Sequence, residues 1–492
     1  MAQGRRLALM RETGRFRMTE DTKKYIKNAE ELPETAETEV LPDMDDEAAA
    51  AGGLAVPVPA AAKDDIADAE GKAADSIENY GYEDVPGSDI TGFEELAEFG
   101  EISEPENAQE QRLFRLMDEI QKVDRNAMIE ALERQEKLAK PPGSLGGLEE
   151  IAVRMAGITG SVKNSIDRSC VVVMCADNGI AEEGVSSAPQ SVTRAQTINL
   201  ARRITGAGVL AESFGSDMLV VDMGVKDPIP EELYTDEPLK DTRKIVNRRL
   251  RAGTSNISEG PAMTLDEVIV SIMTGIEMAD AVSEAGFDIA GVGEMGIGNT
   301  TTSAAVLSAI TGLDSSETCG RGGGINDESF ARKKEIVDAV SEKYRTPDRE
   351  KELDSLEDIR HTVLEILADM GGFDICAMAG VFIGAARNRM PVVIDGYISA
   401  VAALVAYMLA PDSVDYMFAS HQSWEKGYSH AVKALGLSPF LALNMRLGEG
   451  SGCPVAFDVI RGACDVMNRM ATFEEADIND SYLSEIREAD CF

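Results

Sequence analysis

Apolar runs and helical periodicity alternate through the middle of the chain. Four predominantly apolar runs predict strands, at residues 170–175, 218–221, 287–292 and 391–394, and the first is continuously apolar, as is typical of a strand covered on both faces. Segments with helical spacing separate or follow them, at residues 191–204, 264–285, 374–389 and 399–409. This order predicts an α/β fold with a parallel sheet flanked by helices. Ligands bind outside the carboxyl ends of such strands, so the Asp and Gly residues that follow them are expected at one edge.

Helical spacing also marks both ends of this region. Residues 113–132 predict two helices, a loop rich in Pro and Gly follows at 140–148, and a third helix is expected over 148–158. Residues 455–470 predict a helix near the end of the chain. These patterns divide the chain into four parts. They are a leader at residues 1–110, a helical segment at 111–160, an α/β core at 161–440, and a final part with a glycine loop, a helix and a tail at 441–492.

The first 110 residues lack the pattern of a packed domain. Residues 29–106 are dense in Asp and Glu and contain only Lys63 and Lys72 as bases. Low hydrophobicity and high charge leave too little apolar surface to offset the entropy of ordering. We therefore predict a disordered acidic leader. Its role stays open between a tether, a localisation segment and translation from a start codon upstream of the true one.

Charge and cysteine usage limit the class of protein. The 492 residues carry a formal net charge of −40, which argues against nucleic acid and anionic membranes as partners. The seven cysteines form no CxxC pair, as expected in a reducing compartment. The sequence has neither an apolar run of membrane-spanning length nor the core of a signal peptide. We therefore expect a cytoplasmic protein.

One carboxylate lies in a glycine-rich loop close to the end of the core. An apolar run at residues 440–445 leads to Gly448, Glu449, Gly450 and Gly452. Glycine permits close approach of backbone to a ligand, and a lone Glu held by such a loop suits a general base. The competing interpretation is a helix-capping turn with a solvated Glu.

Two further glycine clusters suggest a phosphate site. Residues 291–302 follow a predicted strand and open a helix, where backbone N–H groups favour anions. Residues 320–324 precede a second helix that carries two lysines. The alternative for either cluster alone is a tight turn. The candidate phosphate ligands are Gly293, Gly296, Asn299, Thr300, Gly322, Gly323 and Lys333.

Several other chemistries fit less well. There is no P-loop, no His or Cys spacing for zinc, and no nucleophile elbow for a Ser-His-Asp triad. His421 is either a core histidine or a site-lining one. Gly291, Gly293 and Gly296 match a dinucleotide fingerprint with Asp314 further on, so an NAD-dependent dehydrogenase stays an alternative. With three histidines, acid–base work is expected from carboxylates: Glu449, Glu294, Asp177, Asp222 and Asp395.

Many separate motifs occur in the order typical of one enzyme family. They lie at residues 140–146, 174–179, 291–294, 299–301, 371–374, 384–387, 395–396, 420–421, 425–427 and 445–452. The chain between about residues 116 and 470 resembles the nicotinate-nucleotide:dimethylbenzimidazole phosphoribosyltransferases of cobalamin synthesis. The resemblance implies transfer of phosphoribose from nicotinate mononucleotide to 5,6-dimethylbenzimidazole, a Rossmann-like sheet with a small helical domain, a homodimer, and no metal or cofactor.

The resemblance also implies roles for individual residues. Glu449 falls on the catalytic glutamate and Glu294 on a second glutamate of the site. The two glycine clusters with Asn299, Thr300 and Lys333 fall on the 5′-phosphate site. The residues expected in the base pocket are Asp177, Gln196, Gly448 and Gly450.

Three departures from the family pattern leave the acceptor base open. Asn178 stands where members often have His, Ala188 replaces a base-pocket Ser, and Arg321 is unexpected in its loop. Dimethylbenzimidazole, another benzimidazole, adenine and a phenol all remain candidates. A non-catalytic scaffold, with the acidic leader as its working part, is the alternative outside enzymes.

Overall fold

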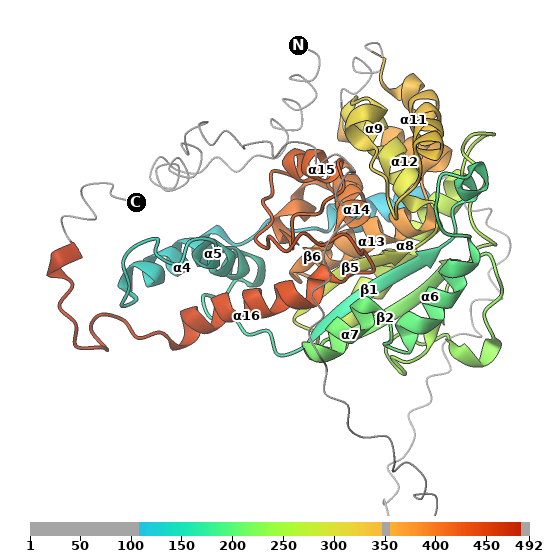
Figure 1. Ribbon diagram of the computed structural model, residues 1–492. Helices are drawn as coiled ribbons and strands as arrows, with labels where there is room; N and C mark the ends of the chain where they lie inside the picture. Colours follow the sequence, from blue (N-terminus) through green and yellow to red (C-terminus); the bar gives the residue numbers. More distant parts are fainter. Residues whose placement is uncertain (1–107, 347–354, 484–492) are drawn as a thin grey trace, which may run out of the picture. The chain divides into compact units, whose positions relative to one another are not determined.

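A parallel sheet of seven strands forms the centre of the computed structural model, which describes residues 108–346 and 355–483 (Figure 1). Residues 1–107 of the predicted acidic leader lie outside the described residues, whereas residues 108–110, predicted as disordered, begin the helix Ala108–Asp118. The strand order is β3-β4-β2-β1-β5-β6-β7 and every neighbouring pair is parallel, which confirms the predicted fold class. The strands are β1 Ser169–Ala176, β2 Asp217–Gly224, β3 Tyr234–Thr235, β4 Ile245–Asn247, β5 Ile289–Met295, β6 Val392–Ile394 and β7 Met417–Ala419.

Helices cover both faces of the sheet. Helix α13 lies against one face with α8 packed on it, while α6, α7 and α16 lie on the other (Figure 1). The chain passes from β2 across β1 to β5, so α8 and α13 lie on the face opposite α6 and α7, as in doubly wound sheets, and α16 at the end of the described chain returns to the first face. The helices are α3 Ala108–Asp118, α4 Arg125–Lys137, α5 Gly147–Thr159, α6 Ser191–Ala201, α7 Gly206–Ser213, α8 Leu265–Glu284, α9 Asn299–Thr311, α10 Ser315–Thr318, α11 Asp327–Ser341, α12 Leu356–Met370, α13 Phe373–Arg387, α14 Tyr397–Leu409, α15 Tyr428–Leu435 and α16 Gly452–Arg469.

Strand β5 extends further than its apolar run predicts. Gly291 and Gly293 lie inside the strand, although glycine normally weakens one. A Cβ on Gly291 would collide with Cys453 and Phe457 of α16, and one on Gly293 would collide with the backbone of Glu449. These glycines therefore allow α16 and its preceding loop to approach the sheet, a role different from the phosphate loop of a dinucleotide fingerprint.

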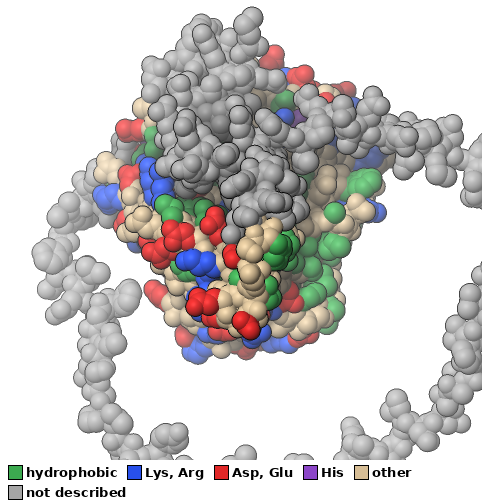
Figure 2. All heavy atoms as spheres, turned by 90° about the vertical axis from the view of Figure 1, so that its left-hand side faces the viewer, with side chains coloured by type: hydrophobic (Ala, Val, Ile, Leu, Met, Phe, Trp, Pro, Cys, Tyr) green, Lys and Arg blue, Asp and Glu red, His purple; other side chains and the backbone are tan. Residues whose placement is uncertain are grey.

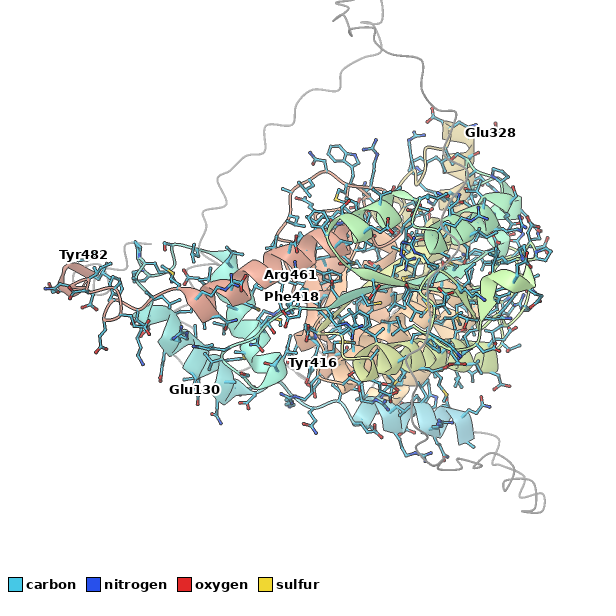
Figure 3. All side chains as sticks on the ribbon, turned by 90° about the horizontal axis from the view of Figure 1, so that it is seen from below. Glu130, Glu328, Tyr416, Phe418, Arg461 and Tyr482 are labelled. Carbon is cyan, nitrogen blue, oxygen red and sulfur yellow. The ribbon has the colours of Figure 1, made fainter. Side chains whose placement is uncertain are left out.

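Helices from both ends of the described chain pack together. Helix α5 contacts α4 and α16. Arg154 of α5 stacks over Phe418 of β7 at 4.4 Å from the ring centre, and Tyr416 donates a hydrogen bond to the Gln121 carbonyl (Figure 3). The exact domain boundaries stay a prediction. In the part of the chain that the structure describes, we find no helix whose length and apolarity would let it span a membrane.

Candidate active site

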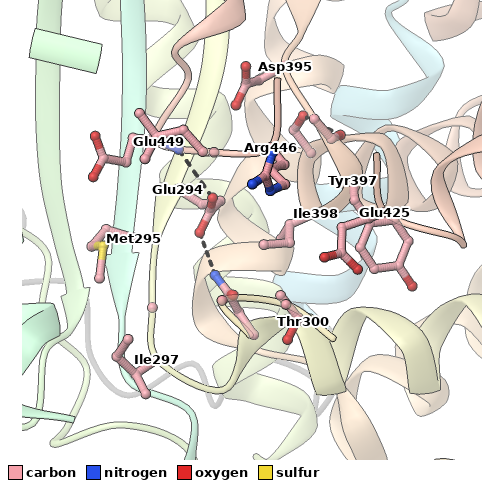
Figure 4. Close-up of a pocket in the computed structure, with 18 of the residues that line it drawn as sticks. Glu294, Met295, Ile297, Thr300, Asp395, Tyr397, Ile398, Glu425, Arg446 and Glu449 are labelled. Carbon is pink, nitrogen blue, oxygen red and sulfur yellow. Dashed lines mark hydrogen bonds between the residues drawn. The ribbon is translucent and has the colours of Figure 1, made fainter. Parts of the chain in front are cut away.

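A pocket opens where the carboxyl ends of β5, β6 and β7 meet the loop before α16 (Figure 4). Its volume of about 260 Å³ suits a small organic ligand. Glu294 at the end of β5, Asp395 after β6 and His421 after β7 line it, together with Glu449 from the loop. The predicted gathering of strand-end carboxylates at one edge is therefore present for these residues.

The loop before α16 brings Glu449 into the pocket in a constrained backbone conformation. Glu449 has φ +62°, and Gly448 and Gly450 have φ +81° and +82°. A side chain at position 448 would also collide with Glu294. Three consecutive residues in the left-handed region explain why glycines flank the glutamate, since other residues rarely adopt it.

The Glu449 carboxylate is buried among neutral hydrogen-bond donors. Gln196 Nε2 of α6 donates to Oε1 at 3.3 Å, and the Ala207 backbone N–H, in the first turn of α7, donates to Oε2 at 3.3 Å. Burial raises the pKa of Glu449 above its ordinary value, and these hydrogen bonds partly oppose the rise. A carboxylate with a raised pKa accepts protons more readily at neutral pH, as a general base must.

Glu294 joins the loop to a second buried carboxylate. Its Oε1 accepts the Glu449 backbone N–H at 3.3 Å, and its Oε2 accepts Asn299 Nδ2 at 2.5 Å (Figure 4). The same Asn299 nitrogen donates to Asp374 at 3.1 Å. Burial, with the negative charge of Asp374, raises the pKa of Glu294 to about 8, and burial raises that of Asp374 to about 6. Glu294 thus fixes the position of Glu449 and can itself hold a proton.

Asp395 anchors the glutamate loop from the opposite side. Its two carboxylate oxygens accept the backbone N–H groups of Gly450 at 3.1 Å and Gly452 at 2.7 Å. Burial raises the pKa of Asp395 to about 7. His421 Nδ1 lies 3.8 Å from the same carboxylate, and burial lowers the pKa of His421 to about 4, so this histidine is neutral at physiological pH. His421 is therefore both buried and site-lining.

The titration of Glu294 should make stability depend on pH. Its folded pKa of about 8 lies above the value of the unfolded chain, so its protonation favours the folded state. This contribution is complete below about pH 4 and is lost as the pH rises toward 8. We expect Glu294→Gln, which cannot ionise, to reduce the fall in the free energy of unfolding between pH 5 and pH 8, measured by urea titration.

A matched control uses Glu183, a glutamate whose pKa is shifted in the opposite direction. Hydrogen bonds from Arg332, Asn256 and Ser258 lower the pKa of Glu183 to about 2. Its contribution to stability is present above about pH 4 and is lost only as the pH falls toward 2. In Glu183→Gln, the free energy of unfolding should therefore fall between pH 5 and pH 8 by the same amount as in the wild type. Equal slopes for all three proteins would contradict the assignment to Glu294.

The two predicted glycine clusters meet on another wall of the pocket. Helix α9 begins at Asn299, four residues earlier than its apolar pattern predicts, so its first turn faces the pocket. Thr300 from this turn lines the pocket with Gly322 and Gly323 from the second cluster, and Gly296 lies beside them. These backbone and hydroxyl groups form a candidate phosphate cradle.

Lys333 lies behind this cradle and does not line the pocket. Its ammonium donates to Thr300 Oγ1 at 2.9 Å and to the Gly320 carbonyl at 3.0 Å, and the side chain is fully buried. Burial lowers its pKa. Lys333 therefore ties the two clusters together and contributes positive charge beneath them.

Other predicted residues have supporting positions. Asp177 does not line the pocket. It accepts hydrogen bonds from Thr193 of α6 and from the Lys226 backbone, so it helps to position the helix that carries Gln196. Gly293 and Gly450 lie just behind the lining. The other predicted residues away from the pocket are Asn178, bonded to Thr302, Asp222, bonded to Tyr234, and Arg321, which pairs with Asp327.

Sequence reasoning missed three residues of this site as individual candidates. Asp374 lies in the first turn of α13 and meets Asn299 only through the fold. Tyr397 begins α14 and Arg446 lies in the glutamate loop, and both line the pocket. Across residues 108–346 and 355–483, no group of three or more His, Cys, Asp or Glu side chains is arranged to hold a metal ion.

Comparison with known proteins identifies the family. The phosphoribosyltransferase family model DBI_PRT matches residues 120–478. The chain is 48% identical over 373 residues to the nicotinate-nucleotide–dimethylbenzimidazole phosphoribosyltransferase of Clostridium perfringens, covering 76% of this chain and 97% of that protein. Its identity to the Clostridium tetani protein of the same name is 45%, covering 76% and 99%. The crystal structure of CobT from Thermus thermophilus matches with a TM-score of 0.65 and 35% identity, covering 72% of this chain and 99% of that one. The chain therefore belongs to the nicotinate-nucleotide–dimethylbenzimidazole phosphoribosyltransferase family.

Proposed function

We propose that this chain transfers the 5-phosphoribosyl group of nicotinate mononucleotide to 5,6-dimethylbenzimidazole or a related base, with Glu449 as the general base, in cobalamin synthesis. The observation that carries the proposal is one pocket with a buried carboxylate on one wall and a phosphate cradle on another. Glu449 and Gln196 belong to the first wall, and Thr300 and Gly322 to the second. One bound nucleotide can therefore present its sugar to an acceptor beside Glu449.

The chemistry follows from the charges of the two substrates. One ring nitrogen of the benzimidazole attacks C1′ of the ribose, and the N–H proton of its other nitrogen passes to the Glu449 carboxylate. The bond from C1′ to the pyridinium nitrogen breaks, and its electron pair stays on nicotinate, so the leaving group needs no acid. The products are an α-riboside 5′-phosphate and nicotinate. Removing the proton as the new bond forms prevents positive charge from building up on the acceptor.

The remaining carboxylates suit the charge that develops on the sugar. Glu294 and Asp395 line the pocket on either side of the Glu449 backbone, which both of them help to hold. When ionised, they would stabilise an oxocarbenium-like transition state electrostatically. Ala188, which stands where the family has a base-pocket Ser, lines the pocket together with Gln196, so the base preference stays open.

We also propose that the enzyme is a homodimer. Ile204, Val209 and Leu447 are exposed around Gly206, and Leu447 both contacts Gly206 and lines the pocket. Ile129 of α4 is exposed on the helical part of the chain. On the side of the molecule that carries α4 and α5, Figure 2 shows hydrophobic side chains along one flank beside mixed acidic and basic ones. Such apolar surfaces favour association between copies.

Sedimentation equilibrium tests the oligomeric state directly. The dimer predicts twice the chain mass of 52.8 kDa at micromolar concentration. Because apolar contacts resist salt, the mass should be the same in 0.1 M and 0.5 M NaCl. A single species of 52.8 kDa would contradict the dimer and leave the transferase proposal untouched.

Turnover with defined substrates tests the activity. Nicotinate release from nicotinate mononucleotide should require an acceptor, and a panel of dimethylbenzimidazole, benzimidazole, adenine and phenol would rank the bases. Reduction of NAD by a hydroxy acid, with no nicotinate release, would instead support the dehydrogenase alternative. Failure with every acceptor would support the scaffold alternative.

A further inference from the structure

Arg446 is the single positively charged side chain among the described residues that line the pocket. Among the described residues that line the pocket, the carboxylates are Glu294, Asp395, Glu425 and Glu449. His421 is neutral at physiological pH, and Lys333 is buried behind the cradle. An anionic ligand that enters this pocket therefore finds one accessible cation.

The guanidinium of Arg446 is available to a ligand. The residue is exposed, and Figure 4 shows its side chain directed into the pocket between Glu294 and Tyr397. Within the described chain, no hydrogen bond or ion pair joins this guanidinium to another residue. Its backbone lies three residues before Glu449, so the hydrogen bonds that hold the glutamate loop also limit where Arg446 can move.

The surroundings of Arg446 suit an aromatic leaving group. Ile398 and Tyr397, which line the pocket and lie beside Arg446 in Figure 4, offer apolar surface. Thr300 and Gly322 on the cradle wall account for the phosphate, and Gln196 and Glu449 account for the acceptor. The part that remains for the pyridine ring of the nucleotide is therefore the part that contains Arg446.

We propose that Arg446 binds the carboxylate of the nicotinate ring and so distinguishes nicotinate mononucleotide from nicotinamide mononucleotide. The inference rests on the proposed transferase function and makes Arg446 a specificity residue for the donor. A guanidinium matches a carboxylate through two parallel, charge-assisted hydrogen bonds. A neutral carboxamide offers one acceptor oxygen and two donor hydrogens, so it loses one hydrogen bond and the charge attraction.

The test compares the two donors in wild-type enzyme and in Arg446→Gln. We expect kcat/KM for nicotinate mononucleotide to fall about 10- to 100-fold, since hydrogen bonds between charged partners are worth about 1.5–3 kcal/mol. The loss should lie mainly in KM, because the contact is present before and during the reaction. kcat/KM for nicotinamide mononucleotide should stay within about threefold of wild type, and Arg446→Lys should recover part of the loss.

Arg469 provides a control for the loss of one positive charge. Arg469→Gln removes one exposed positive charge from the last turn of α16, outside the pocket lining, and should change neither donor. An equal loss with both donors would assign Arg446 to the phosphate and overturn the proposal, as would no change with either. Absence of turnover by the wild type with both donors would instead reject the transferase function itself.

Discussion

Glu449→Gln is expected to lower kcat for phosphoribosyl transfer by about 10²–10⁴-fold, the range typical of general acid–base catalysis. Glutamine preserves the size of the side chain and can keep the hydrogen bond with Gln196, but it cannot accept the acceptor's proton. Steady-state nicotinate release should show the loss in kcat with little change in KM for either substrate, because the proton moves only in the transition state.

Glu294→Gln separates catalysis by Glu449 from positioning of its loop. Because glutamine can still accept one hydrogen bond, from either Asn299 or the Glu449 backbone, we expect a smaller loss of kcat than in Glu449→Gln. A Glu449→Gln enzyme with wild-type kcat would show that the proton goes elsewhere. If Glu294→Gln then shows a large loss of kcat, Glu294 would be the general base.

Asp395→Ala is expected to lower both stability and kcat. The buried N–H groups of Gly450 and Gly452 would lose their acceptor, at about 1–3 kcal/mol for each unsatisfied group. The released loop would no longer hold Glu449 at its place, and a misplacement of about 1 Å can cost about 10²-fold in rate. Urea unfolding and single-turnover nicotinate release, the latter at a temperature where the variant is folded, would measure the two effects.

Asp222 provides a matched control for the loop anchor. It is also buried at the carboxyl end of a strand and accepts two backbone N–H groups, those of Gly224 and Val225, but it does not line the pocket. Asp222→Ala should therefore lose comparable stability with a much smaller loss of kcat. Equal losses of kcat in the two variants would mean that Asp395 matters only through general stability. If Asp395→Ala does not fold, Asp395→Asn, which keeps one acceptor oxygen, takes its place.

The long buried strands and the short strand β6 could be predicted from the sequence, and three other short strands could not. Every residue of β1 is buried on a sheet covered from both sides, so its apolar run is unbroken. Strand β6 has three residues, but Asp395 and Gly396 directly after its apolar run mark its end. Strands β3, β4 and β7 have two or three residues each without such a signal, and they are strands because a neighbour pairs with them. Strand β5 extends through Gly293, where the Glu449 loop packs against it. The residues near Gly293 in the sequence do not reveal this contact, because the loop lies far away in the chain.

The candidate site shows the same division. Glu449, Asn299 and Thr300 stand in glycine-rich local patterns, and local pattern indicated both the base and the anion site. Asp374 also follows two glycines, but its partner Asn299 lies 75 residues away in the chain, so local pattern does not indicate their contact. Lys333 was expected at the phosphate, but only the fold shows that it reaches the cradle through Thr300 and Gly320.

The most direct test of the proposed function identifies the product of wild-type turnover. Purified full-length enzyme, nicotinate mononucleotide and 5,6-dimethylbenzimidazole would be incubated, and the products separated and assigned by NMR. We predict one nicotinate released for each riboside 5′-phosphate formed, with the new bond in the α configuration, as attack opposite the leaving group requires. Nicotinate released without a new riboside, a product in the β configuration, or no reaction would contradict the proposed transfer.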